Sequence, residues 1–236
     1  MPASGEFEGF RPEAIQFLAD LVEHNDREWF NPRKRDYERL LKAPFEALVR
    51  AMADRFDERG LPLQADPKRS LFRIYRDTRF SRDKAPYKTH LGASFPWIDR
   101  SSDVPVADER AHGNGAYFHF APGDMHVGGG MWQPDKERLG AFRRLIVDEP
   151  DKVTDALAAP EFVAAFGRVT SHDRLKRVPP GYPADHPHAE LLTFRDVIFG
   201  RPLADAEVLS PSLPDTLVEA YVAALPVLRL LATLRG

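Results

Sequence analysis

The chain has 236 residues and a formal net charge of −3, from 33 Lys or Arg and 36 Asp or Glu. A balance this close to neutral argues against the broad basic surface that sequence-independent binding to nucleic acid or to a membrane requires. The chain has no cysteine, which excludes disulfides, thiolate zinc sites and thiol nucleophiles. It shows no signal-peptide pattern and no run of about 18 apolar residues, so we expect a cytoplasmic protein without a membrane span.

Apolar residues recur at helical spacing through the first 60 residues. A helix is predicted over residues 12–24. A second helix is expected to open at Asn31, which would cap it, and Pro44 is expected to force a kink or a fresh start. A third helix then runs to Gly60, a residue type that commonly follows a helix end. We therefore predict a helical layer over residues 12–60.

The middle of the chain changes to the alternating pattern of β-strands. Residues 71–75 and 88–95 each read as a strand, and residues 99–114 read as a polar surface loop. Residues 115–130 are predicted to form a hairpin with Pro122-Gly123 at its tip, so that His119 faces His126. Alternation then gives one apolar face, to which Phe72 and Ile74 also belong, and one polar face with Arg73, Tyr75, Lys88, His90, Tyr117, His119 and His126.

The last hundred residues return to helical patterns. Helices are predicted over 134–147, near 150–158 and around 160–166, followed by an irregular segment over 175–187 and a short strand within 191–199. A final helix over about 213–234 is expected to kink at Pro226. The order of elements predicts an α+β fold, with an antiparallel sheet in the middle of the chain packed on one face by N-terminal and C-terminal helices. We expect a single domain over 1–236, made of the 12–60 layer, strands over 70–130 and the remainder over 134–236.

The most unusual stretch of the sequence is a basic turn between two predicted strands. Residues 68–90 carry eight Lys or Arg and two Asp, a local charge of +6 in an acidic chain. Arginine presents a planar fork that fits phosphate or carboxylate, so a cluster of this kind implies an anion. A purely structural explanation is a web of ion pairs that includes Asp77 and Asp83. The candidate anion ligands are Arg73, Arg76, Arg79, Arg82, Lys84 and Lys88.

Two further features of the middle segment are candidates for a site. Gly128, Gly129 and Gly130 permit close approach of a ligand or positive φ, but they are weak as a phosphate motif, and a bulged strand end explains them better. His119 and His126, with Asp124 nearby, form a possible metal-ligand set, but paired surface histidines are ordinary, and we predict no metal and no cofactor. The sequence identifies no catalytic residue; the candidates for proton transfer are His90, Tyr75 and Tyr87.

The sequence resembles a bacterial and fungal family of conserved hypothetical proteins, the domain of unknown function 2461. The resemblance rests on NDREWF at 25–30 with Lys34 and Tyr37 after it, on FRIYRDTRFSRDKAPYKTH at 72–90, on YFHFAPGDMHVGGGMW at 117–132, and on LKRVPPGYPADHP at 175–187 with a following Leu pair. Two places depart from the expected pattern, Gly181 and the segment LLTFRD. The resemblance implies one domain along the chain and no particular activity.

Three functions remain open from the sequence. The first is the binding of a phosphorylated or carboxylated small molecule through the basic turn, the polar sheet face and Gly128 to Gly130. The second is nucleic-acid binding, with Tyr75 and Tyr117 as stacking platforms. The third is a protein-interaction domain, which an exposed apolar patch would mark. The sequence gives no oligomeric state.

Overall fold

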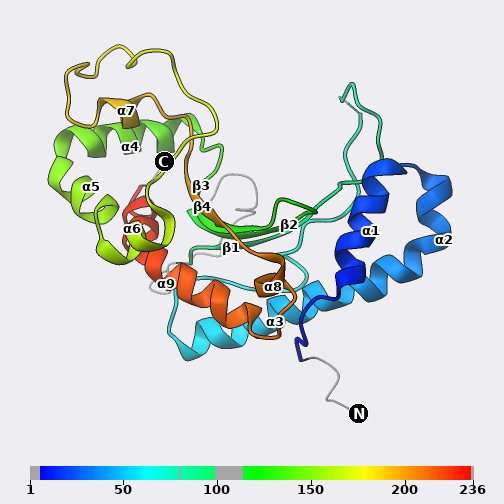
Figure 1. Cartoon of the computed structure of the whole chain (residues 1–236). Helices are drawn as coiled ribbons and strands as arrows, with labels where there is room; N and C mark the ends of the chain where they lie inside the picture. The colour runs from blue at the N-terminus through cyan, green and yellow to red at the C-terminus, as the bar shows by residue number, and fades with distance from the viewer. Residues whose placement is uncertain (1–5, 80, 99–113, 235–236) are drawn as a thin grey trace. The chain divides into compact units, whose positions relative to one another are not determined.

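A computed structural model describes residues 6–79, 81–98 and 114–234, and it confirms the α+β class (Figure 1). The chain divides into two compact units. Unit 1 comprises Met1–Phe95, Tyr117–Val127 and Pro202–Val218; unit 2 comprises Pro96–Ala116, Gly128–Arg201 and Glu219–Gly236. The predicted loop at 99–114 lies outside the described residues except for Asn114.

One four-stranded antiparallel sheet runs through the middle of the chain. Its strands are β1 (Leu91–Pro96), β2 (Asn114–Phe120), β3 (His126–Met131) and β4 (Val197–Pro202), in the order β1-β2-β3-β4. The predicted hairpin is confirmed as β2 and β3.

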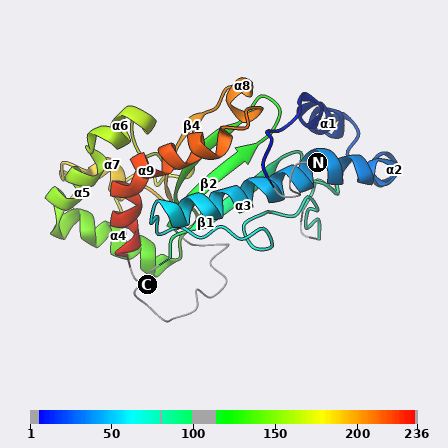
Figure 2. The ribbon, with the colours of Figure 1, turned by 90° about the horizontal axis from the view of Figure 1, so that it is seen from below.

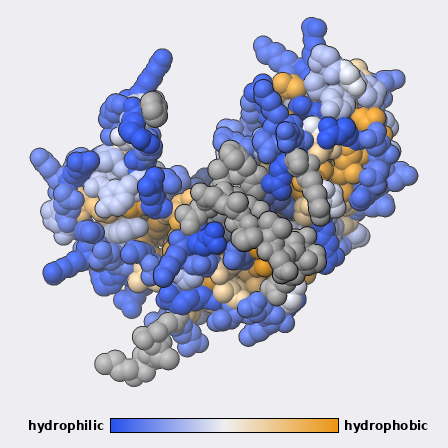
Figure 3. Space-filling view, turned by 180° about the vertical axis from the view of Figure 1, so that it is seen from behind, coloured by the Kyte–Doolittle hydropathy of each residue, from blue (hydrophilic) through white to orange (hydrophobic). Residues whose placement is uncertain are grey.

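Polar and charged residues cover most of the molecular face seen in Figure 3. Among the described helices, none is both long and apolar enough to cross a membrane.

The helices of unit 1 follow the predicted pattern with one shifted boundary. They are α1 (Pro12–Glu23), α2 (Arg27–Tyr37), a π-helical turn (Glu38–Lys42) and α3 (Ala43–Glu58). The expected start of the second helix at Asn31 was wrong, because the Asp26 side chain accepts a hydrogen bond from the Trp29 N–H and caps the helix earlier. The π-helical turn comes directly before α3, whose first turn contains Pro44. The backbone stays helical through this turn, so the chain makes no fresh start at Pro44.

Aromatic side chains of unit 1 attach α3 to the inner face of the sheet. Phe45 stacks on Phe118 with ring centroids 5.6 Å apart, and Phe56 meets Phe95 edge-on at 5.4 Å. All four rings are fully buried. Figure 2 shows α3 running along β1 and β2. The predicted apolar face of β2 is therefore confirmed as the core of this unit.

The segment over 71–75 is not a regular strand, contrary to the prediction. It makes two isolated antiparallel bridges, Leu71 with Ala93 and Tyr75 with Tyr87. The backbone groups of Tyr87 are taken instead by a side chain: the Asn25 amide donates to the Tyr87 carbonyl and accepts from the Tyr87 N–H, both at 3.0 Å. Asn25 thus takes the place of a neighbouring strand, which satisfies the backbone of Tyr87 without a continuous ladder.

Unit 2 holds the second group of helices. They are α4 (Lys136–Asp148), α5 (Pro150–Leu157), α6 (Pro160–Phe166) and α7 (Ala189–Leu192), while α8 (Asp205–Val208) and the first residues of α9 (Leu213–Ala232) belong to unit 1. The predicted strand within 191–199 starts late, at Val197. Arg143 donates to the carbonyls of Leu192 and Phe194, both at 3.0 Å, and holds these residues in a turn. Pro226 lies inside α9, which continues past it.

Replacing Tyr37 by Phe tests the packing of unit 1 at alkaline pH. Burial, with a smaller contribution from nearby Tyr75 and Glu46, raises the pKa of Tyr37 to about 12. A tyrosine whose pKa is raised by folding contributes stability that is complete below pH 10 and lost as the pH approaches 12. Over this pH interval we expect the free energy of unfolding of wild type to fall by about 3 kcal/mol more than that of Tyr37→Phe. Denaturant unfolding at each pH measures both values. Parallel pH profiles of the two proteins would contradict the burial of the hydroxyl.

Replacing Asn25 by Ala tests the contact with Tyr87. The substitution removes two hydrogen bonds and leaves a backbone donor and acceptor without their partner, so we expect the free energy of unfolding to fall by about 2 kcal/mol. Asn31→Ala is the matched control, because Asn31 is exposed on α2 and its replacement should change stability by less than about 0.5 kcal/mol. Equal effects of the two substitutions in urea unfolding would show that the Asn25 contact contributes nothing specific.

Candidate functional site

The outer side of the sheet in unit 1 carries a group of polar rings. Along β2 the residues alternate, with Phe118 and Phe120 buried and Tyr117 and His119 half-buried on the other side. His126 opens β3, and His90 directly precedes β1. We call this group the histidine face; it consists of His90, Tyr117, His119, Asp124 and His126.

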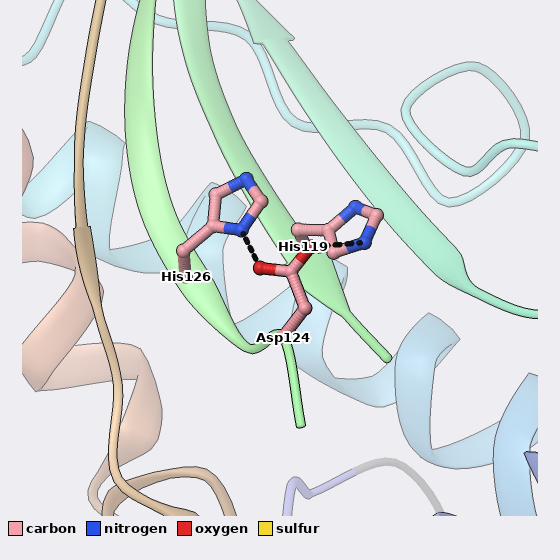
Figure 4. Close-up of side chains that lie close together, drawn as sticks. All are labelled: His119, Asp124 and His126. Carbon is pink, nitrogen blue, oxygen red and sulfur yellow. Dashed lines mark hydrogen bonds and ion pairs between the residues drawn. The ribbon is translucent and has the colours of Figure 1, made fainter. Parts of the chain in front are cut away.

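The Asp124 carboxylate lies between two histidines, as Figure 4 shows. Its Oδ1 is 3.0 Å from His126 Nδ1, and its Oδ2 is 3.8 Å from His119 Nε2. The two imidazole rings stack with centroids 4.6 Å apart, which agrees with the predicted pairing across the hairpin. The ring of His90 lies 4.8 Å from that of His119. Residues from three parts of the chain therefore meet here.

Tyr117 fixes the orientation of His119. Its hydroxyl lies 2.9 Å from His119 Nδ1. The ring reaches this position because Gly92, in the neighbouring strand, has no side chain: a Cβ there would lie 2.6 Å from the Tyr117 hydroxyl. Sequence reasoning missed the part played by Gly92. The signal was its place on the polar face of a strand, where a glycine leaves room for a large neighbour.

Burial keeps two of the histidines uncharged. It lowers the pKa of His119 to about 4, with further contributions from His126 and His90. Burial also lowers the pKa of His90, assisted by the charge of Lys88. Both imidazoles are therefore neutral near pH 7 and can accept a hydrogen bond or a metal ion through one nitrogen.

Two cations continue the histidine face. Lys88 Nζ lies 5.2 Å above the ring of Phe72, whose centroid is 6.2 Å from that of Tyr117. Phe72 was predicted on the apolar face with Ile74; that was wrong for Phe72, which lies beside Tyr117 because the segment lacks regular strand geometry. Burial, and then the charge of Arg73, lowers the pKa of Lys88. Among the described residues no carboxylate forms an ion pair with Arg73 or Lys88, although the charge of Arg73 adds to that of Arg79 in lowering the pKa of Asp77.

The remaining basic residues of the turn are largely occupied within it. Arg76 pairs with Asp83, and Arg79 pairs with Asp77 at 2.7 Å. Lys84 donates to the Thr78 carbonyl at 2.9 Å, while Arg82 is exposed. The two aspartates thus hold two of the arginines, as the alternative of an ion-pair web predicts. The structure brings Arg73 and Lys88 together and directs Arg76, Arg79 and Lys84 to contacts inside the turn.

The two tyrosines proposed for proton transfer have different surroundings. Tyr87 is buried and stacks on Phe30 with ring centroids 4.0 Å apart, so its position is explained by packing. Tyr75 is 49% exposed and lies at the edge of this aromatic group, with its centroid 5.5 Å from that of Tyr87. Of the three candidates, His90 is the one that the structure places on the histidine face.

A family of conserved hypothetical proteins, DUF2461, matches the sequence over residues 13–229. The chain belongs to this family. Comparisons with curated proteins and with solved structures gave no match. In this DUF2461 member, the first two stretches that carried the resemblance are in contact with each other: Asn25 and Phe30 of the first hold Tyr87 of the second.

The three glycines of the DUF2461 chain lie in β3, within unit 2, and they face backbone atoms. A Cβ at Gly128 would lie 2.2 Å from the Phe199 carbonyl oxygen, and one at Gly130 would lie 2.1 Å from that of Val197. Gly130 also has a φ of +117°. At Gly129 the nearest atom is the Gly115 carbonyl oxygen, at 2.5 Å. Close approach of the neighbouring strands therefore explains all three residues.

Substitution of Gly128 by Ala distinguishes this explanation from ligand binding. The new methyl group would press on a strand backbone, so we expect a loss of about 3 kcal/mol or more in the free energy of unfolding. Gly140→Ala is the control: its Cβ meets only the flexible end of Arg144 at 3.3 Å, and the change favours helix α4. A Gly128→Ala protein of unchanged stability would overturn the packing explanation. Denaturant unfolding gives both values.

Proposed function

We propose that Arg73 and Lys88, together with His90 of the histidine face, bind a small phosphorylated or carboxylated molecule. The observation that carries the proposal is the placement of these two cations near each other without a carboxylate partner in the described residues. Other cations of the same stretch are neutralised locally, as Arg76 is by Asp83 and Arg79 by Asp77. A bound anion would neutralise the remaining pair in the same way.

The electrostatics of Lys88 support a bound anion. Its charge is half-buried, and both this burial and the neighbouring Arg73 disfavour the protonated form. An anion placed between them would offset the repulsion and replace the lost hydration. Phe72 beneath the ammonium group provides an apolar surface for the uncharged part of a ligand.

His90 is the group we propose for hydrogen bonding to the ligand. It lies within electrostatic range of Lys88, and its ring is next to that of His119. A neutral imidazole can donate one hydrogen bond to a phosphate or carboxylate oxygen. If the ligand is transformed, His90 is the candidate for proton transfer, since its pKa lies below the usual value near neutrality. We propose a cytoplasmic setting for this binding, because a chain without cysteine gains nothing from an oxidising compartment.

The test is ligand binding by wild type and by charge-removing variants. A thermal-shift screen with inorganic phosphate, nucleoside monophosphates, sugar phosphates and dicarboxylates identifies the ligand class, and calorimetry then gives its dissociation constant. Loss of a charged hydrogen bond costs about 1.5–3 kcal/mol, so Lys88→Gln and Arg73→Gln should each weaken binding roughly tenfold or more. Arg82→Gln is the matched control, because it removes the same charge from an exposed side chain of the same turn.

Each outcome of this test has a definite meaning. Loss of anion binding in Lys88→Gln and Arg73→Gln, but not in Arg82→Gln, supports the site. Equal weakening in Arg82→Gln would show attraction by the overall charge of the turn, and no binding of any anion by wild type would overturn the proposal. Binding of a single-stranded oligonucleotide that falls steeply with salt, and that is lost in Tyr75→Ala, would favour nucleic-acid binding instead.

A further inference from the structure

We propose that His119, Asp124 and His126 form a binding site for one divalent transition-metal ion. The ligand atoms are His119 Nε2, His126 Nδ1 and the Asp124 carboxylate. The proposal goes beyond anion binding and does not depend on it, since none of these three residues is among the cations assigned to the anion.

The three groups already converge on a small volume. One ligand atom from each residue lies within 4.8 Å of the others. In a tetrahedral site two ligands of one zinc ion lie about 3.4 Å apart, since each sits about 2.0–2.1 Å from the metal. The Asp124 side chain is 69% exposed on the turn between β2 and β3. A side-chain movement of about 1.5 Å therefore completes the geometry. Figure 4 shows the three side chains facing one another.

The contact of Asp124 with His119 is too long to be a hydrogen bond. His119 Nε2 and Asp124 Oδ2 face each other at 3.8 Å, beyond hydrogen-bonding range. When Nδ1 carries the proton, Nε2 presents a lone pair, and two electron-donating atoms then point toward the same space. A cation between the two atoms interacts favourably with both lone pairs, whereas direct contact of the two atoms leaves both without a partner.

Tyr117 supplies the outer support that metal-binding histidines usually have. In the proposed site His119 donates its Nδ1 proton to the Tyr117 oxygen, 2.9 Å away, and this fixes the Nε2 lone pair toward Asp124. Ligating histidines commonly make such a second hydrogen bond, and its loss costs about 10–100-fold in metal affinity. Tyr117 is accordingly a positioning residue that does not itself touch the ion.

Two histidines and a carboxylate suit zinc and the neighbouring first-row metals better than calcium or magnesium, which prefer oxygen ligands. Three protein ligands leave at least one coordination position open for water or for an oxygen of a bound molecule. The proposed ion would therefore keep one coordination position at which water can exchange with an oxygen of a bound molecule.

The experiment measures zinc binding by metal-free full-length protein. Isothermal titration with Zn²⁺ should give one ion per chain, and Co²⁺ should give the visible absorption of a low-coordinate site. We expect His119→Gln, His126→Gln and Asp124→Asn each to weaken zinc binding at least a hundredfold, and Tyr117→Phe to weaken it about 10–100-fold. His24→Gln is the control. His24 is an exposed histidine at the end of α1 and is not one of the proposed ligands, so its replacement should leave zinc binding unchanged.

The outcomes separate this site from the anion site and from misfolding. The metal-free melting temperature of each variant shows whether it folds; if His119→Gln does not, the exposed Asp124→Asn still tests the site. Arg82→Gln, which removes a charge from an exposed side chain outside both proposed sites, should bind zinc as wild type does. Zinc binding that survives in Asp124→Asn and His126→Gln, or that falls equally in His24→Gln, would overturn the proposal, as would no binding by wild type. None of these results affects the Arg73 and Lys88 test.

Discussion

The packing of α3 on the inner face of the sheet determines what the outer face can do. Phe45 and Phe56 bury Phe118 and Phe95, and this contact fixes the alternation along β2. Once Phe118 points inward, Tyr117 and His119 must point outward, because neighbouring residues of a strand lie on opposite faces. A shift of one residue would exchange the buried rings with the polar ones, so the apolar core and the histidine face depend on the same register.

The part of the site that follows from local alternation could be predicted from the sequence. The hairpin, its Pro122-Gly123 tip and the pairing of His119 with His126 all come from residues close together in the chain. The irregular course of residues 71–75 could not, and neither could the contact of Asn25, whose side chain reaches Tyr87 across 62 residues of sequence. A side-chain contact of this kind leaves no periodic pattern. The face predicted for Phe72 was wrong because the prediction assumed regular alternation over residues 71–75, which do not form a regular strand.

The count of charged residues located the basic stretch, but it could not show which of its cations are paired with acids. Eight cations and two acids give the same total whichever arginines are paired. The structure shows that Asp77 and Asp83 take Arg79 and Arg76, which stabilises the turn and leaves the cations nearest the sheet, Arg73 and Lys88, without such partners. Gly128 and Gly130 could be interpreted only once β4 was placed beside β3, since the atoms they accommodate belong to residues about 70 positions away.

Half-burial acts against charge in both kinds of side chain on this face. It lowers the pKa of His119, of His90 and of Lys88, and the charge of Arg73 lowers the pKa of Lys88 further, as the charge of Lys88 does that of His90. The charge of Lys88 is therefore costly to maintain without an anion, whereas the neutral imidazoles keep lone pairs that can bind a metal ion. Ions of opposite sign therefore suit opposite ends of the face: a metal ion at the nitrogen lone pairs beside Asp124, and an anion at Lys88 and Arg73.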